Sequence, residues 1–338
     1  MLEMGYFMGM KKIILALYLL ILMLPCGAFA FPVRPITIYV PFSAGGATEK
    51  LASIIADRIE KNINQKVFVK TNSNNNNISA TEFINQVKSV PNDGYHLILG
   101  NLGTHASSLT VDKETVFYDP IHDFEPIALL GKTPMYLIVR PNFPVKNFKQ
   151  FLRYLYRNPK KTITIAHAGQ GSTSYLAGIY FASILKLDLN FIAYGGSDPA
   201  LKDIANGYVD MMIDQTTSAL SYIQGKLVKS LLITSQRRSV LTPSTPCSSQ
   251  VGLHEFNING WNMLFAPQGI SKLNQKKLNK IIVDALDNKF VQSDFRLLNT
   301  IILDSDKNTP EYLKLFLKQE IDYWQEITGI IKQKDNFY

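Results

Sequence analysis

Cysteine and histidine are scarce in this sequence, and the common metal-binding motifs are absent. The 338 residues include two cysteines, Cys26 and Cys247, and five histidines, no two of which have the spacing of metal ligands on a helix. No HExxH or CxxC pattern occurs, so no metal site is expected. The glycine-rich stretches fit neither the P-loop nor the GxGxxG pattern, and no cofactor is expected.

Runs of basic residues interleaved with aromatic residues are also missing. The formal net charge is +8, but both signs alternate along most of the chain. This pattern indicates solubility or attraction to anionic ligands, and it argues against nucleic-acid binding.

Long apolar runs are limited to one segment, residues 13–24, which is too short for a comfortable membrane span. Two lysines precede it and small residues follow at 28–30, which is the pattern of a secretory signal peptide. We therefore expect a signal peptide at residues 1–30, cleavage after Ala30 and a periplasmic mature chain. Cleavage after Ala30 would remove Cys26 and leave only Cys247, so no intrachain disulfide is expected. The alternative to this cleavage is the attachment of a lipid to Cys26.

What the sequence does contain is enough apolar material for two domains. The chain is 338 residues long and 46% of its residues are apolar. Strand-like and helix-like segments alternate from residue 36 to residue 100 in the order βαβαβ, and the alternation returns between 135 and 234. This order predicts an α/β protein with parallel sheets and crossover helices. The last helix, near 310–332, has one apolar face that we expect to pack on the first domain: Leu313, Phe316, Leu317, Ile321, Trp324 and Ile327.

The turn after the first expected strand is suited to bind an anion. The strand Ile36–Val40 is followed by Gly45 and Gly46, where the backbone can approach a ligand closely. Thr48 is a possible N-cap of the next helix, whose free N–H groups attract a carboxylate or a phosphate. The alternative is an ordinary βα turn.

A comparable turn occurs in the second half of the chain. Gly169 and Gly171 precede the hydroxyl residues 172–174 at the expected start of a helix. Ligands of parallel sheets gather at the carboxyl ends of the strands, where residues 42–48 and 101–105 are also expected. The two turns could therefore face each other across a cleft.

Four polar residues near these turns have more than one interpretation. Ser172 could be a nucleophile, but it lacks the GxSxG context, and a hydrogen-bonding hydroxyl is the simpler interpretation. Asp214 could bind a ligand amine or water, or it could cap the next helix. His105 and His167 could each hydrogen-bond a ligand or be tied to the backbone.

Taken in order, the motifs resemble those of the Bug-type solute receptors, the periplasmic substrate-binding proteins of tripartite tricarboxylate transporters. They include Pro-Phe-x-x-Gly-Gly at 41–46, Pro-Asn-Asp-Gly-Tyr at 91–95 and Gly-Thr-His at 103–105. The longest match is YGGSDPALKDIANGYVDMMID at 194–214. The resemblance covers the chain from residue 31 to about residue 332.

This resemblance implies a two-lobed flytrap fold of the periplasmic-binding-protein type, with a mostly parallel sheet and flanking helices in each lobe. Lobe 1 would comprise residues 31–133 and 237–338, and lobe 2 residues 134–236. The implied activity is non-enzymatic capture of a small organic carboxylate: a di- or tricarboxylate, an acidic amino acid or an aromatic acid. The implied ligand-binding residues come from the loops named above: Phe42, Ser43, Ala44, Gly45, Gly46, Thr48, Asn101, Gly103, Thr104, Gly171, Ser172, Thr173, Ser174, Tyr194, Gly195 and Asp214.

The implied partners are the membrane components of a tripartite transporter, and the receptor is expected to be a monomer. The alternatives are a sensory module that signals to a kinase and an exported serine hydrolase that uses Ser172. The chain departs from the family pattern at 74–77, where asparagines replace glycines. It also departs at Tyr175 and Gly195, where the family often has His and Lys, so the resemblance leaves the identity of the carboxylate open.

Overall fold

The computed structural model of the protein describes residues 31–72, 78–111, 116–158 and 162–335. The chain separates into two compact units, Met1–Val33 and Arg34–Tyr338, and the fold described below is that of the second unit. The expected signal peptide and the asparagine-rich loop at 74–77 lie outside the described residues. No helix in the described ranges is long and apolar enough to cross a membrane.

The first sheet is built around the strand that the sequence places first. Its order is β2 (Val67–Thr71), β1 (Ile36–Val40), β3 (His96–Asn101), β9 (Asn259–Pro267) and β4 (Phe124–Val139). The strands β2, β1 and β3 are parallel, and β9 is antiparallel to both β3 and β4. Four of the five strands therefore point the same way, so their carboxyl ends share one edge.

The second sheet repeats this plan. Strands β6 (Leu189–Ala193), β5 (Ile163–His167) and β7 (Met211–Gln215) are parallel, whereas β4 pairs antiparallel with β7 and with β8 (Lys229–Ile233). Again four of the five strands point the same way. The predicted α/β class, with a mostly parallel sheet in each half, is confirmed.

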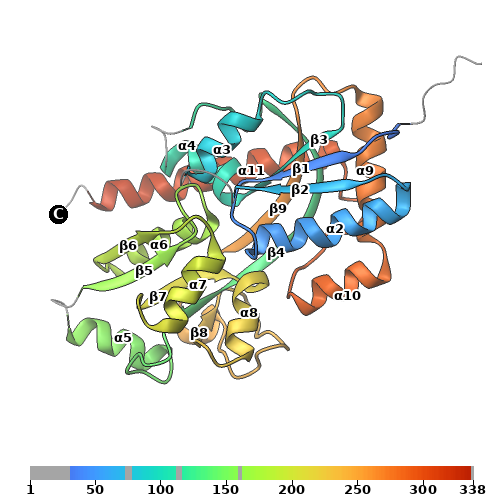
Figure 1. The fold of residues 1–338 in the computed structure, drawn as a ribbon. Coiled ribbons are helices and arrows are strands. Elements are labelled where there is room, and N and C mark those ends of the chain that lie inside the picture. Colours follow the sequence, from blue (N-terminus) through green and yellow to red (C-terminus); the bar gives the residue numbers. More distant parts are fainter. Residues whose placement is uncertain (1–30, 73–77, 112–115, 159–161, 336–338) are drawn as a thin grey trace, which may run out of the picture. The chain divides into compact units, whose positions relative to one another are not determined.

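Strand β4 belongs to both sheets, which the sequence did not indicate (Figure 1). Its first part, from Phe124 to Pro134, pairs with β9, and its last part, from Met135 to Val139, pairs with β7. The sequence predicts a strand only over this last part, and proline is uncommon inside strands. Pro134 is tolerated because it stands where one ladder ends and the next begins.

The helices begin and end close to the predicted positions. They are α2 (Ala47–Ile63), α3 (Ala80–Val87), α4 (Ser108–Val111), α5 (Phe148–Arg157), α6 (Thr173–Leu185), α7 (Ser197–Asn206), α8 (Thr216–Gln224), α9 (Lys272–Leu286), α10 (Lys289–Leu297) and α11 (Pro310–Asp335), with short turns η1 (Gly103–Ser107) and η2 (Ser248–Val251). The sequence did not predict α4, α10, η1, η2 or β9. Helix α10 is separated from α9 by the Asn288 cap, whose side chain accepts from Phe290 N at 3.0 Å.

The C-terminal helix α11 packs with the apolar face that the sequence predicts. Leu313, Leu317 and Ile321 are buried in the core together with the residues of η1 and β4. The face also contacts a helix from the middle of the chain. Trp324 also meets Tyr180 of α6, with ring centroids 5.8 Å apart, because α6 lies beside η1.

Candidate functional site

The first turns of four helices meet at one buried cavity. It is lined by residues from the starts of α2, α6, α7 and α8 and from the ends of β3, β5 and β7: Phe42, Gly46, Ala47, Thr48, Asn101, Ala168, Ser172, Thr173, Ser174, Ser197, Asp214 and Gln215. The first N–H groups of a helix have no partner within the helix and carry partial positive charge. A cavity where four such ends meet is therefore suited to an anion. It measures about 20 Å³ in this conformation, room for about one water.

Helix α2 begins two residues earlier than predicted, at Ala47. Its N-cap is Gly46, at φ −77° and ψ 174°, and no side chain caps it. The prediction that Thr48 is the N-cap is wrong, because the chain is already helical there. Glu49 instead accepts a hydrogen bond from Gly45 N at 3.2 Å, outside the cavity-lining set.

Helix α6 begins with a network of hydroxyl groups. Ser172 is its N-cap and accepts from Tyr175 N at 3.2 Å, and its hydroxyl lies 3.1 Å from that of Ser174. Ala168 N donates to the Ser174 hydroxyl at 2.9 Å. The hydroxyl of Thr173 is buried and has no partner within the described chain, although it lies on the cavity wall. It is thus available to a bound molecule.

Asp214 brings a carboxylate to the same cavity. Ser197 donates to its Oδ1 at 3.0 Å and Ser218 donates to its Oδ2. Burial raises the pKa of Asp214 to about 6, although these hydrogen bonds and the positive charge of Lys50 act in the opposite direction. The carboxyl group is therefore partly protonated in mildly acidic solution, where it repels an anion less.

Gln215 is a wall residue that sequence reasoning missed, and so are Ala47, Ala168 and Ser197. Asn262 of β9 donates to Gln215 Oε1 at 3.1 Å, which orients the amide. Nothing in the pattern around Gln215 could have indicated this, because Asn262 is 47 residues away. Ser197 could have been found, since it follows two glycines at a helix start as Ser172 follows Gly171.

Several other predicted site residues lie where the two halves of the chain touch. Ser43 N donates to Gly195 O at 3.1 Å. A Cβ on Gly103 would lie 2.3 Å from Gly171 O, so only glycine allows this approach. Gly45 lies close to Asp198, whose Cγ would be 3.1 Å from an added Cβ. These residues join the halves around the cavity but do not line it.

The remaining predicted residues have local roles in the structure. Thr104 is tied to Asn101, with Thr104 N donating to Asn101 Oδ1 at 3.0 Å. Tyr194 donates to Asp203 at 2.7 Å, and Ala44 is exposed. Among the predicted residues, those on the cavity wall are Phe42, Gly46, Thr48, Asn101, Ser172, Thr173, Ser174 and Asp214.

The two histidines beside the predicted loops, His105 and His167, are packed against aromatic rings. His105 stacks on Phe265 with centroids 4.2 Å apart, and its Nδ1 lies 2.9 Å from the hydroxyl of Thr104. Burial lowers the pKa of His105 to about 3, so this ring is neutral. His167 stacks on Tyr175 at 4.5 Å, and burial lowers its pKa as well. Within the described residues, no hydrogen bond joins Ser172 to either histidine.

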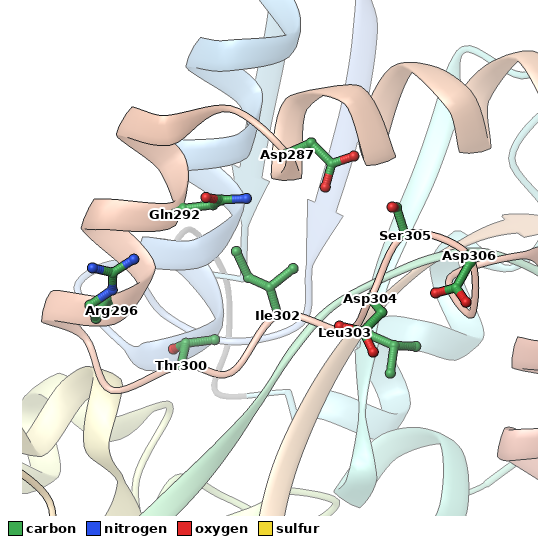
Figure 2. A pocket seen from close by; sticks show the side chains of 9 residues that line it. All are labelled: Asp287, Gln292, Arg296, Thr300, Ile302, Leu303, Asp304, Ser305 and Asp306. Atoms are coloured by element: carbon green, nitrogen blue, oxygen red, sulfur yellow. The ribbon is translucent and has the colours of Figure 1, made fainter.

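A second hollow of about 450 Å³ lies beside α10 (Figure 2). Arg296 and three carboxylates line it, and Asp287 lies apart from Asp304 and Asp306 in Figure 2. Among its described lining residues, none is the N-cap or one of the first three residues of a helix. Within the described ranges, no group of His, Cys, Asp and Glu residues is arranged to hold a metal ion. We therefore take the helix-start cavity as the candidate site.

Comparisons of the sequence and of the structure with known proteins point to the same family. The model of the tripartite tricarboxylate transporter family receptor matches residues 51–328. The UPF0065 protein in the tcbD-tcbE intergenic region of Pseudomonas sp. (strain P51) is 32% identical over 302 residues, covering 88% of this chain and 86% of that protein.

Two solved structures extend this similarity to the fold. MatC from Rhodopseudomonas palustris with bound malate is 31% identical, with a TM-score of 0.83, and the match covers 88% of this chain and all of MatC. The periplasmic binding protein BugD is also 31% identical, with a TM-score of 0.83 and coverage of 89% and 99%. The two-lobed periplasmic-binding-protein fold and the resemblance to Bug-type receptors are confirmed.

Proposed function

The chain belongs to the tripartite tricarboxylate transporter receptor family, and we propose that it captures a small organic carboxylate in the helix-start cavity. It would then deliver this solute to the membrane components of a tripartite transporter. The solute class is a di- or tricarboxylate, an acidic amino acid or an aromatic acid. The malate bound to MatC supports a carboxylate, since malate is a dicarboxylic acid.

The observation that carries this proposal is the meeting of the four helix starts. Their backbone N–H groups can hold a carboxylate without an arginine. No Lys or Arg lines the cavity in the described part of the chain. The unpartnered hydroxyl of Thr173 and the oriented amide of Gln215 add donors from two different helix starts. Together these groups match the two oxygens of one carboxylate.

We propose that the remaining predicted residues act by closing the lobes. In this proposal lobe 1 comprises residues 31–133 and 237–338 and lobe 2 comprises 134–236. The Ser43–Gly195 hydrogen bond and the close approach of Gly103 to Gly171 would then join the lobes in a closed conformation. A cavity of about 20 Å³ is smaller than any organic acid, so the lobes must part for a ligand to enter. A ligand that touches both lobes would favour their closure.

The same proposal places the receptor in the periplasm as a monomer after removal of residues 1–30. Its output could go to a transporter or to a sensor kinase, and the genes beside its own would distinguish them. The hydrolase alternative has no support from Ser172, whose hydroxyl is occupied as the cap of α6.

A thermal-shift screen of the mature chain against organic acids tests the function. Ligand at ~100 times its dissociation constant adds ~2.7 kcal/mol to the free energy of unfolding, which raises Tm by several degrees. Amines and sugars serve as controls. Stabilisation by one class of carboxylate is the expected result, and no stabilisation by any acid would refute the proposal.

A further inference from the structure

Beside the helix-start cavity lies a larger one, which we call the chamber. It measures about 670 Å³, within the range of small-molecule sites. Pro41, Asn72 and Ile78 line it from one side, and His167, Tyr175 and Tyr194 from the other. Ala168 lines both the chamber and the helix-start cavity, so the two spaces are neighbours. A ligand held by its carboxylate would extend into the chamber.

One wall of the chamber is a cluster of three rings. His167 and Tyr175 are stacked, with centroids 4.5 Å apart and an interplanar angle of 29°. Phe191 meets Tyr175 edge-on at 90°, with centroids 5.8 Å apart. All three rings line the chamber, and Tyr175 is only half-buried. Because His167 and Tyr175 already stack on each other, another ring can extend this stack on the outer face of the half-buried Tyr175.

The chamber has no cation to receive a second carboxylate. Among its described lining residues there is no Lys or Arg, and the one carboxylate is that of Glu82. Glu82 accepts from Ser79 N at 2.6 Å and so is held at the chamber edge. His167 is neutral, because burial lowers its pKa. The start of α3 also lines the chamber, but its capping box already uses Ser79 N and Glu82 N, and the Asn72 amide donates to the carbonyls of Pro41 and Ile78. A second negative charge on the ligand would therefore lie near Glu82 with no Lys or Arg of the described lining to pair with it.

We propose that the ligand is an aromatic monocarboxylate, whose ring stacks on the half-buried Tyr175 in the chamber while its carboxylate lies in the helix-start cavity. This inference rests on the proposed function and narrows it. It sets this receptor apart from one that binds malate, because a dicarboxylate would leave one charge unpaired in the chamber.

Calorimetric titration of the mature chain tests the preference directly. The probes are benzoate, phenylacetate and 3-phenylpropanoate, compared with succinate and adipate. Cyclohexanecarboxylate serves as the non-aromatic comparator. We expect at least one arylcarboxylate to bind at least tenfold more tightly than either dicarboxylate.

Three variants at two positions, Gly195 and Tyr175, locate the effect in the chamber. Gly195 lines it, and a Cβ added there would meet no atom within 4 Å. Gly195→Lys should improve dicarboxylate binding by on the order of tenfold, because it supplies a charged donor. Gly195→Met is the matched control, since it supplies the length of the side chain without the charge. Tyr175→Leu should weaken arylcarboxylate binding by about three- to tenfold and leave cyclohexanecarboxylate unchanged.

The outcomes separate this inference from the function on which it rests. Tighter binding of a dicarboxylate than of any arylcarboxylate by the unmodified chain would overturn the inference and leave the carboxylate receptor standing. Equal effects of Gly195→Lys and Gly195→Met would also overturn it. Failure of every acid to bind would overturn both.

Discussion

Replacement of Gly46 by aspartate should abolish ligand binding without unfolding the protein. Gly46 has backbone angles that any residue adopts, φ −77° and ψ 174°. A Cβ there would lie 3.6 Å from Ser43 O and 3.8 Å from Ser197 N, which are ordinary contacts. Aspartate is also a good N-cap, so the stability of α2 should change by only about 0.3 kcal/mol.

The size of the effect follows from the position of the new charge. Gly46 lies on the cavity wall, so the carboxylate of Gly46→Asp would lie about 4 Å from that of the ligand. Two like charges at this distance repel by about 4 kcal/mol at an effective dielectric constant of about 20. This energy corresponds to a loss of affinity of about a thousandfold.

The matched control is Gly46→Asn, which has the same shape and capping ability but no charge. Calorimetric titration with the best acid from the screen, at pH 7.5, should show less than a tenfold loss for the asparagine variant. Equal losses in both variants would assign the effect to bulk. Unchanged affinity in a folded Gly46→Asp would remove the loop at 42–48 from the site and refute the reasoning.

Three further predictions concern the cavity carboxylate, the contact between the two halves of the chain, and the core. Because the pKa of Asp214 rises from 3.8 to about 6 on folding, its contribution to stability is present below pH ~4 and is lost as the pH rises through ~6. Urea titrations of the unmodified protein and of Asp214→Asn should thus show that the unmodified protein loses ~3 kcal/mol more unfolding free energy between pH 4 and pH 7. If the unfolding free energies of the two proteins changed with pH in parallel, the prediction would be contradicted. Gly103→Ala should lower the free energy of unfolding by about 1–3 kcal/mol and weaken ligand binding, because its Cβ would lie 2.3 Å from Gly171 O. An unchanged Tm and an unchanged affinity would argue against a closed contact there. Leu317→Ala should cost about 2–5 kcal/mol by urea denaturation, because Leu317 is 2% exposed, whereas Leu315→Ala, at 55% exposed, should change stability by less than about 0.5 kcal/mol.

Local patterns in the sequence were sufficient to predict most of the helices and strands. The strand Ile36–Val40 was predicted with its observed bounds, and the last helix begins at Pro310, where the sequence predicts it. These features depend on residues two to four positions apart, whose spacing is visible in the chain itself. The start of α2 was misplaced because Gly46, which has no side chain, is its cap, and a side-chain pattern cannot show that.

The candidate site was only partly accessible to the same reasoning. The sequence indicates two glycine-bearing turns with hydroxyl residues at helix starts, and residues of both turns lie on one cavity wall. It also indicates that the site has no arginine. These are properties of short segments, so a single sequence can carry them.

Only the tertiary structure decides which segments meet. Ser43 touches Gly195, and Gly103 touches Gly171, because strand β4 runs through both sheets and brings their edges together. Gln215 lines the cavity with its amide held by Asn262, and the chamber forms between two groups of residues, 41–82 and 167–195, that are at least 85 positions apart. Such contacts depend on the packing of the whole core, and no local periodicity encodes them. The sequence alone therefore determines the elements and the chemistry of their ends, and the packing determines that four of those ends face one cavity.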